Sequence, residues 1–268
     1  MTPPSPPDPS RDVELLSSLY TNPRTLRLFS VVAVLAAWEY AGRVGVSAAF
    51  PTFTETAMAW FMMVGDGSLP AALAITLVPL AIGILVSAAI GVASGLAMGL
   101  SRRAEWLGLP LFIVLQAAPL AAIIPLLVLA YGVGLLTKVV TVCVMAVPVI
   151  VLNSFKAIRH TPASLEEMGR SFLGTRRQLI VKIILPAASP VIFAGLRLGL
   201  AAGFIGAILA ELLISPTGIG DLITFYQSIA EYPRMYAAIA TVMLLSLFFI
   251  ELLEVVETHL FRPEKRAR

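Results

Sequence analysis

Six long apolar runs, separated by short polar segments, dominate the sequence. Each run reaches the roughly 20 residues that a helix needs to cross the hydrocarbon layer of a membrane. The runs lack strand-like alternation, and backbone groups in lipid must be satisfied within their own segment, so the pattern predicts helices. The predicted spans cover residues 27–47, 71–100, 107–131, 134–153, 190–213 and 236–257.

The connections between these runs differ in character. Gly132 and Gly134 interrupt the chain between the third and fourth runs, which predicts a tight hairpin. The loops 48–70 and 214–235 are longer, and the second combines turn residues with an amphipathic stretch. That stretch fits a short re-entrant or interfacial helix about as well as a plain connector.

Composition agrees with a membrane protein. The 268-residue chain is 58% hydrophobic and 13% charged, with a mean hydropathy of +0.90. Because soluble domains are typically about half apolar and a quarter charged, an ordinary soluble domain is excluded. The predicted fold class is an all-α polytopic membrane protein with about six transmembrane helices. Cys143 is the only cysteine, which excludes an internal disulfide.

The cations divide unevenly between the two sides of the predicted membrane. One side carries only Arg43, Lys138 and Arg234, whereas Arg197 lies inside the fifth run. The positive-inside rule therefore predicts that both termini and the segment Ser164–Pro190 are cytoplasmic. The cations that define this side are Arg11, Arg24, Arg27, Arg102, Arg103, Lys156, Arg159, Arg170, Arg176, Arg177, Lys182, Arg262, Lys265, Arg266 and Arg268.

Three parts of the chain follow from these patterns. Residues 1–26 are Pro-rich and polar without an apolar run, which predicts a disordered cytoplasmic tail and not a signal peptide. Residues 27–260 form the predicted transmembrane domain, with a cytoplasmic loop at 154–189, and residues 261–268 form a basic cytoplasmic tail. The cations lie between apolar runs and not along one face, so the net charge of +3 does not indicate a nucleic-acid partner.

The cytoplasmic segment carries helix-start signals followed by a break. Ser164 and Glu167 fit a capping box, and Pro162 suits the first turn of a helix. Gly174 and Thr175 then predict the start of a second helix, which covers Arg176–Ile184 and ends before Pro186. The first helix has one narrow apolar face, formed by Leu165, Met168 and Phe172. Such a pair fits packing on the membrane surface about as well as docking to a soluble partner.

This segment resembles the EAA motif of the membrane subunits of ATP-binding-cassette importers, whose pattern is E-A-A-x₃-G-x₉-I-x-L-P. Laid without gaps, Glu167 takes the Glu position and Met168 and Gly169 take the two Ala positions. Leu173 stands where the family has Gly, and Gly174 follows one residue later. The closing I-x-L-P is matched by Ile183, Leu185 and Pro186, and further matches are Pro190, Ile192–Leu200 and Ala210–Leu213. The resemblance covers roughly residues 70–260.

The resemblance implies a permease of the type I importer architecture, in the branch that imports nitrate, sulfonates and taurine. It further implies a bacterial plasma (inner) membrane location, a second permease copy, an extracytoplasmic solute-binding protein and a separate ATPase subunit. The short EAA helix would dock into a groove of that ATPase as a coupling helix. The implied coupling residues are Leu165, Glu166, Glu167, Met168, Gly169, Arg170, Phe172, Gly174, Leu185 and Pro186.

Sequence motifs for catalysis are missing from the chain. It contains no G-x₄-G-K-[ST], H-E-x-x-H or G-x-S-x-G, and no Cys/His cluster with metal-ligand spacing. We therefore expect no catalytic residues, no cofactor and no metal, and ATP hydrolysis in another subunit.

Polar groups within the spans are candidates for function because they are costly in lipid. Glu39 most simply makes helix–helix or interfacial hydrogen bonds. Arg197 and Glu211 are candidates for a translocation path. For Arg197 the favoured alternative is that its side chain extends towards the inner membrane surface, and for Glu211 a structural role near the outer gate is favoured. Gln116 is the best path-lining candidate, because neighbouring prolines free backbone carbonyls: Pro110, Pro119 and Pro125.

Small residues also recur every fourth position in two spans. Gly91, Gly95 and Gly99 form one ladder. Gly195, Gly199 and Gly203 form the second. Both ladders allow helices to approach closely, and internal packing is favoured over a dimer interface.

These observations predict a permease subunit that forms the path for a small solute, with an organic or inorganic anion such as a sulfonate or nitrate favoured. Alternating access driven by ATP would carry the solute. An importer of aromatic acids or vitamin-precursor pyrimidines, and an ATP-independent secondary transporter or channel subunit, remain open alternatives.

Overall fold

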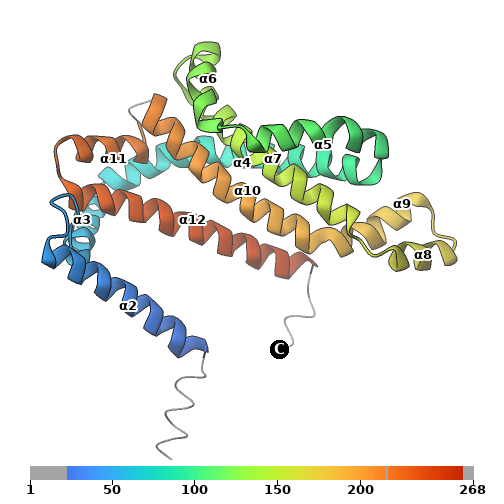
Figure 1. Cartoon of the computed structure of the whole chain (residues 1–268), viewed down its shortest axis with the longest axis horizontal. Coiled ribbons are helices and arrows are strands. Elements are labelled where there is room, and N and C mark those ends of the chain that lie inside the picture. The colour runs from blue at the N-terminus through green and yellow to red at the C-terminus, as the bar shows by residue number, and fades with distance from the viewer. Residues whose placement is uncertain (1–22, 215–216, 262–268) are drawn as a thin grey trace, which may run out of the picture.

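The computed structural model describes residues 23–214 and 217–261, and this part of the chain is almost entirely helical (Figure 1). The predicted tails at 1–26 and 261–268 lie largely outside the described residues. The elements are α2 (Pro23–Val44), α3 (Phe53–Gly65), α4 (Ser68–Leu100), α5 (Arg102–Ala117), the 3₁₀ turn η1 (Leu120–Ile123), α6 (Ile124–Tyr131), α7 (Leu135–Arg159), α8 (Ala163–Ser171), α9 (Arg176–Leu179), the π-helical segment η2 (Ile180–Ile184), α10 (Leu185–Ile214), α11 (Ile219–Ser228) and α12 (Tyr232–Phe261).

Five helices of the described chain are long and apolar enough to cross a membrane: Thr25–Val44, Ser68–Leu100, Leu135–Arg159, Arg176–Ile214 and Tyr232–His259. They coincide with the first, second, fourth, fifth and sixth predicted spans. The polytopic α-helical fold class is therefore confirmed.

The third predicted span, 107–131, is wrong as a single helix. Helix α5 ends at Ala117, and Ala118 adopts an extended backbone with ψ 145°. Pro119 explains the break, because proline disfavours helical backbone in the preceding residue and supplies no amide hydrogen. The chain resumes as η1 and the short helix α6, in which Pro125 occupies the first turn.

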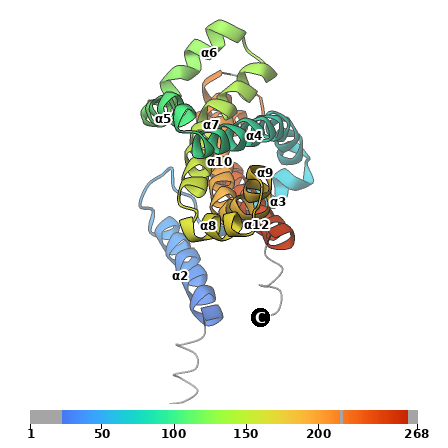
Figure 2. The same cartoon turned by 90° about the vertical axis from the view of Figure 1, so that its right-hand side faces the viewer.

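Helix α7 is the centre of the bundle and packs mainly against α4 and α10 (Figures 1 and 2). Val142, Ile150 and Val151 on this helix are fully buried. The glycine ladder of α4 lies against α7: a β-carbon at Gly95 would lie 2.5 Å from Cβ of Ser154 and 2.7 Å from the carbonyl oxygen of Val151. Only glycine allows this approach of two backbones, so the ladders serve internal packing, as predicted.

The two ends of the bundle carry different small helices (Figure 1). One end holds α8, α9 and η2. The opposite end holds α11 and α3, and α11 is the short helix expected in the 214–235 loop. Helix α3 was not expected, although Thr52 and Glu55 at its start form a capping box.

Helix α2 diverges from the other spans and meets the bundle only near its C-terminal end (Figures 1 and 2). There the indole nitrogen of Trp38 donates a hydrogen bond of 3.1 Å to the carbonyl oxygen of Pro51. The carboxylate of Glu39 accepts hydrogen bonds from the backbone and hydroxyl of Thr54 and pairs with Arg43. Glu39 therefore joins α2 to the start of α3, the structural role predicted for it.

Candidate functional site

The candidate coupling segment is a short helical hairpin in which α8 packs on α9 and η2. Gly169 lies at this contact: a β-carbon at that position would lie 2.4 Å from Cδ1 of Ile183 and 2.5 Å from Cδ2 of Leu179, so these two side chains occupy the space that a larger residue would need. Gly169 and Leu179 are buried. The second Ala position of the motif is therefore occupied by glycine at the point where α8 contacts α9 and η2. The missing side chain lets α8 lie close to them.

The N-cap of helix α8 lies two residues earlier than predicted. Its N-cap is Pro162 and it starts at Ala163, so the predicted capping box of Ser164 and Glu167 is wrong. Pro162 can end the preceding turn without losing a hydrogen bond, because it has no amide to satisfy. The capping box of this segment lies at Thr175 and Gln178 instead, at the start of α9.

The turn after α8 is a Schellman motif with leucine at its left-handed position. The amide of Gly174 donates to the carbonyl oxygen of Gly169 at 3.1 Å, and the amide of Leu173 donates to that of Arg170 at 2.9 Å. Leu173 has φ 57°. This motif normally takes glycine at that position because a β-carbon is unfavourable there. Leu173 stands where the family pattern has Gly, and the geometry explains why that pattern prefers glycine.

Leu173→Gly should stabilise this turn by about 1 kcal/mol, since the left-handed strain is removed and an exposed side chain loses no packing. The measurement is amide hydrogen exchange at Gly174, whose protection should rise about fivefold. Leu173→Ala is the control, because it shortens the side chain but keeps the β-carbon. If the Gly174 amide were equally protected from exchange in Leu173→Gly and Leu173→Ala, the left-handed backbone of residue 173 would not be strained by its β-carbon.

The tip of the hairpin exposes apolar side chains to solvent. Phe172 is 82% exposed and Leu173 is 91% exposed, and Met168 lies exposed one turn before Phe172. Within the part of the chain that the structure describes, more than four-fifths of Phe172 and of Leu173 is left uncovered. Exposed apolar side chains of this size, on a hydrogen-bonded turn outside the spans, are typical of a docking surface. We call Met168, Phe172 and Leu173 the apolar tip.

The other predicted coupling residues surround this tip or lie further along the chain. Glu167 and Arg170 are exposed, whereas Leu165, Glu166 and Gly174 are partly buried. Arg170 approaches Glu166 to 3.7 Å. Leu185 packs with a buried cluster at the start of α10, and Pro186 is exposed there, so these two residues do not belong to the tip.

The second predicted helix does not end before Pro186. Residues Arg176–Ile214 form one continuous helical stretch. The π-helical segment η2 accounts for this, because the amide of Leu185 reaches back five residues to the carbonyl oxygen of Ile180. A π-turn before proline relieves the clash between the proline ring and the preceding turn. The hairpin is therefore joined rigidly to the span α10.

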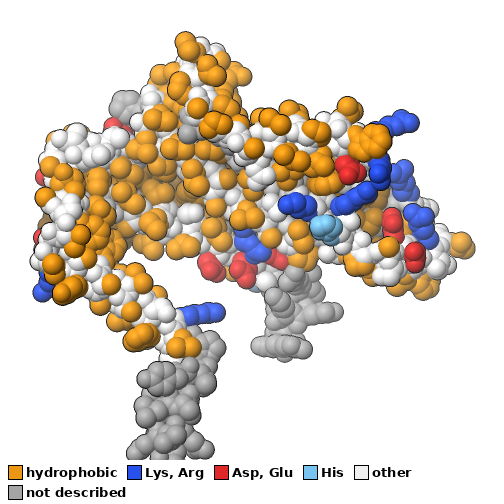
Figure 3. Space-filling view, viewed as in Figure 1, with side chains coloured by type: hydrophobic (Ala, Val, Ile, Leu, Met, Phe, Trp, Pro, Cys, Tyr) orange, Lys and Arg blue, Asp and Glu red, His pale blue; other side chains and the backbone are white. Residues whose placement is uncertain are grey.

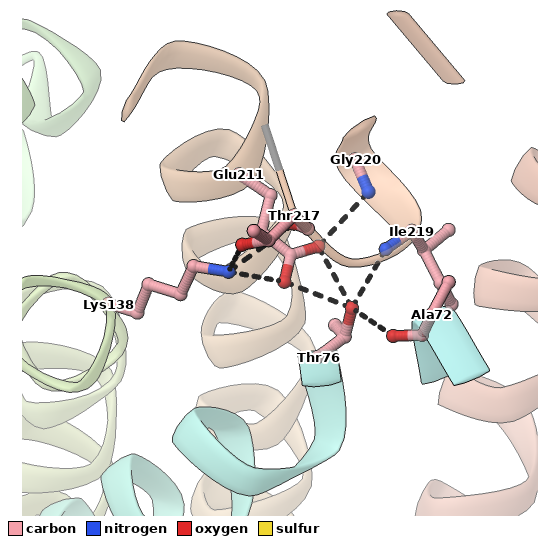
Figure 4. A network of polar contacts seen from close by, with 7 residues as sticks. All are labelled: Ala72, Thr76, Lys138, Glu211, Thr217, Ile219 and Gly220. Atoms are coloured by element: carbon pink, nitrogen blue, oxygen red, sulfur yellow. Dashed lines mark hydrogen bonds and ion pairs between the residues drawn. The ribbon is translucent and has the colours of Figure 1, made fainter. Parts of the chain in front are cut away.

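A buried polar network lies towards the opposite end of the bundle (Figure 4). Glu211 on α10 is 3% exposed, and the ammonium of Lys138 on α7 lies 2.9 Å from its Oε1. The hydroxyl of Thr76 on α4 contacts the same carboxylate at 2.9–3.0 Å. The Lys138 ammonium also donates to the hydroxyl of Thr217 at 2.9 Å. One carboxylate thus connects three spans and a loop.

The start of α11 is held by the same network. The amide of Gly220 donates to Oε2 of Glu211, and the amide of Ile219 donates to the hydroxyl of Thr76, both at 3.0 Å. Gly218, with φ 88°, makes the turn that brings these amides inward. A carboxylate at a helix N-terminus is also favoured by the helix dipole.

Sequence reasoning placed Lys138 among the outer cations and missed its pairing with Glu211. The signal was present, because Lys138 lies inside the predicted span 134–153 and an intramembrane cation requires a partner. Glu211 has the structural contacts that were favoured for it. Its place in a translocation path remains a prediction.

The other two path candidates are not part of the contacts described for this network. Arg197 pairs with Glu257 on α12 at 3.0 Å and approaches Glu254 at 3.8 Å. Its charge is therefore balanced by carboxylates. Gln116 is exposed at the end of α5, next to the break at Ala118. The path-lining role of both residues stays a prediction.

The end of the molecule that carries the hairpin is rich in Lys and Arg, as Figure 3 shows. Arg159 at the end of α7 reaches Glu105 in the first turn of α5 at 3.7 Å. Arg102 lies over the ring of Trp106, 5.8 Å from its centroid. The end of the helical bundle that carries the exposed hairpin is therefore also the end where these cations gather.

The chain belongs to the family described as "Binding-protein-dependent transport system inner membrane component", whose model matches residues 87–262. It is therefore a multi-pass permease subunit of an ATP-driven importer, and ATP hydrolysis resides in a separate subunit. The predicted family is confirmed, and a binding protein and an ATPase are the partners that this family implies.

Two relatives and one solved structure illustrate the similarity. The putative aliphatic sulfonates transport permease protein SsuC of Bacillus subtilis (strain 168) is 31% identical over 226 residues, covering 82% of each chain. The riboflavin transport system permease protein RibX of Chloroflexus aurantiacus is 34% identical over 155 residues, covering 58% of each chain. The crystal structure of an amino acid ABC transporter superposes with a TM-score of 0.61 at 18% identity, over 75% of this chain and 98% of that chain, which shows the shared fold.

Proposed function

We propose that this permease imports a small sulfonate-type organic anion, as a homodimer that docks one ATPase subunit on each cytoplasmic hairpin. The observation that supports docking is the apolar tip. It is exposed on a hairpin whose helices pack closely at Gly169, at the cation-rich end of the bundle. The similarity to an aliphatic sulfonate permease over most of both chains supports the substrate class.

The orientation follows from charge. The hairpin end carries Arg102, Arg159 and Arg176, whereas Arg43 and Arg234 lie near the opposite end. Under the positive-inside rule the hairpin end faces the cytoplasm, with both termini. The proposed transmembrane domain covers 27–260, and its proposed cytoplasmic part lies within 154–189, from the end of α7 to the start of α10.

Rigid connections explain how docking reaches the membrane. The hairpin continues through η2 into α10, which packs along α7, and α7 packs along α4. Closure of an ATPase pair that displaces the hairpin would therefore move α10 together with these spans. Packed helices have discrete arrangements and not a continuum, so the displacement switches access between the two sides.

Transport in proteoliposomes tests this function. The permease is reconstituted with its ATPase and binding protein, and uptake of taurine and of a longer alkanesulfonate is measured with and without ATP. We expect uptake of a sulfonate only with ATP. Uptake without ATP by the permease alone would support a secondary transporter or channel instead.

Riboflavin is the second substrate to test, because RibX is similar over 58% of this chain. A flavin or vitamin-precursor importer would take up riboflavin or a formylaminopyrimidine and ignore sulfonates. Such a result would keep the ATP-driven permease and replace the substrate class.

A further inference from the structure

A cleft of about 670 Å³ lies behind the hairpin, between the ends of α4 and α7 and the segment α8–η2. One wall is apolar and includes Leu100, Ile158 and Ile184. The remaining wall is strongly charged and is formed by Arg159, Arg170, Arg176 and Glu166. The volume is within the range of pockets that hold small molecules.

The charges of this cleft favour an anion. Arg159 lies 3.7 Å from Glu105, and Arg170 lies 3.7 Å from Glu166. Both separations exceed the 2.7–3.2 Å of a direct N–H···O hydrogen bond, so the guanidinium donors keep capacity for a ligand. Among the residues that the structure describes, Arg176 has no ion-pair partner, and three arginines face one lining glutamate.

The depth of the cleft is indicated by Trp106. This side chain is 70% exposed and lies next to Glu105, the residue that approaches Arg159. Exposed tryptophan in a membrane protein is enriched at the level of the lipid headgroups. The cleft therefore opens where phosphate groups of the bilayer are present, with its apolar wall continuing towards the spans.

We propose that this cleft binds the phosphoryl group of an anionic phospholipid. Arginine is suited to this ligand because its planar donors match phosphate oxygens in pairs. Leu100, Ile158 and Ile184 provide a surface for the first carbons of the acyl chains. Basic pockets between helices at the cytoplasmic side are a known form of headgroup recognition. This proposal rests on the proposed function in one respect only, namely that the cleft faces the cytoplasmic side of the membrane.

Lipid titration of the full-length chain in detergent tests this site. Short-chain phosphatidylglycerol is compared with phosphatidylcholine of the same chain length, by calorimetry and without ATP. We expect phosphatidylglycerol to bind more tightly. Arg176→Gln should weaken its binding about fivefold, the factor for one cation at a membrane surface. Glu166→Gln should tighten binding by a similar factor, because the one opposing charge of the lining is removed.

Arg177→Gln is the matched control, because this arginine is exposed in the same turn but does not line the cleft. The Arg177→Gln variant should bind phosphatidylglycerol as tightly as the unmodified chain does. Equal weakening by Arg177→Gln and Arg176→Gln, or equal binding of the two lipids, would overturn the site. Inorganic phosphate is added as a competitor: displacement of phosphatidylglycerol supports recognition of the phosphoryl group alone, and retention supports the whole lipid as ligand. Since no transport is measured, failure here leaves the importer function standing.

Discussion

Replacing Glu211 with glutamine should lower the free energy of unfolding by about 3–5 kcal/mol, the usual result of leaving one partner of a buried ion pair alone. The Lys138 ammonium lies 2.9 Å from the carboxylate, and the Lys138 side chain is 6% exposed. In Glu211→Gln the charge of Lys138 would stay buried, next to the neutral amide of the glutamine side chain. The amide of Gly220 would also lose the charged acceptor that favours the start of α11.

Cys143 provides the measurement. It is the only cysteine of the chain, and it is partly buried on α7, so a thiol-reactive fluorophore reports opening of the bundle on heating. Lys138→Met combined with Glu211→Gln should recover most of the loss, because no buried charge remains. Glu231→Gln, which removes an exposed ion pair with Arg234, should change stability by less than about 1 kcal/mol. A Glu211→Gln variant as stable as Glu231→Gln would contradict the role of the network.

The long spans were predictable because their signal is composition over some twenty residues. The break inside 107–131 was not predicted, although its cause was visible: Pro119 was placed inside one span, where it would free a backbone carbonyl, and it ends α5 instead. A kink and a break begin with the same lost hydrogen bond. Which one results depends on whether the neighbouring helices satisfy the freed backbone, and a single sequence does not contain that information.

The hairpin was predictable in identity and less so in detail. The motif positions placed two short helices correctly, but the N-terminal cap moved from Ser164 to Pro162 and the second helix continued through Pro186. Both differences arise from backbone hydrogen bonding between adjacent turns. At Leu173 the sequence did indicate the detail. The family pattern has Gly at this position, and the structure has a left-handed backbone there.

The Lys138–Glu211 network shows a different limit. Its members come from α4, α7, α10 and the loop before α11, and Thr76 and Glu211 are 135 residues apart. Glu211 and Lys138 could each be recognised in the sequence as costly in lipid, but Thr76 carried no such signal. An intramembrane Lys and an intramembrane Glu require partners, but only the packing of α7 against α10 shows that they satisfy one another.

Truncating the apolar tip should uncouple the permease from its ATPase without unfolding it. Phe172→Ala removes a ring that is 82% exposed and makes no contact that the bundle needs, so stability should change by less than about 0.5 kcal/mol. An aromatic anchor at the centre of an interface typically contributes about 2–4 kcal/mol to binding. Binding of the ATPase should therefore weaken about 30-fold to 1000-fold, and ATP-driven uptake should fall with it.

The measurement is copurification of the ATPase with the tagged permease, followed by its affinity in detergent. Phe29→Ala is the matched control, because Phe29 on α2 is 72% exposed and lies on a helix apart from the hairpin. It should retain the ATPase. Glu167→Lys adds a second test, since a reversed charge beside the tip should weaken docking while the hairpin stays folded, as the exposure of Glu167 allows. Normal ATPase binding in both Phe172→Ala and Glu167→Lys would show that the hairpin is not the docking element, because the two changes remove the largest exposed ring of the tip and reverse a charge beside it.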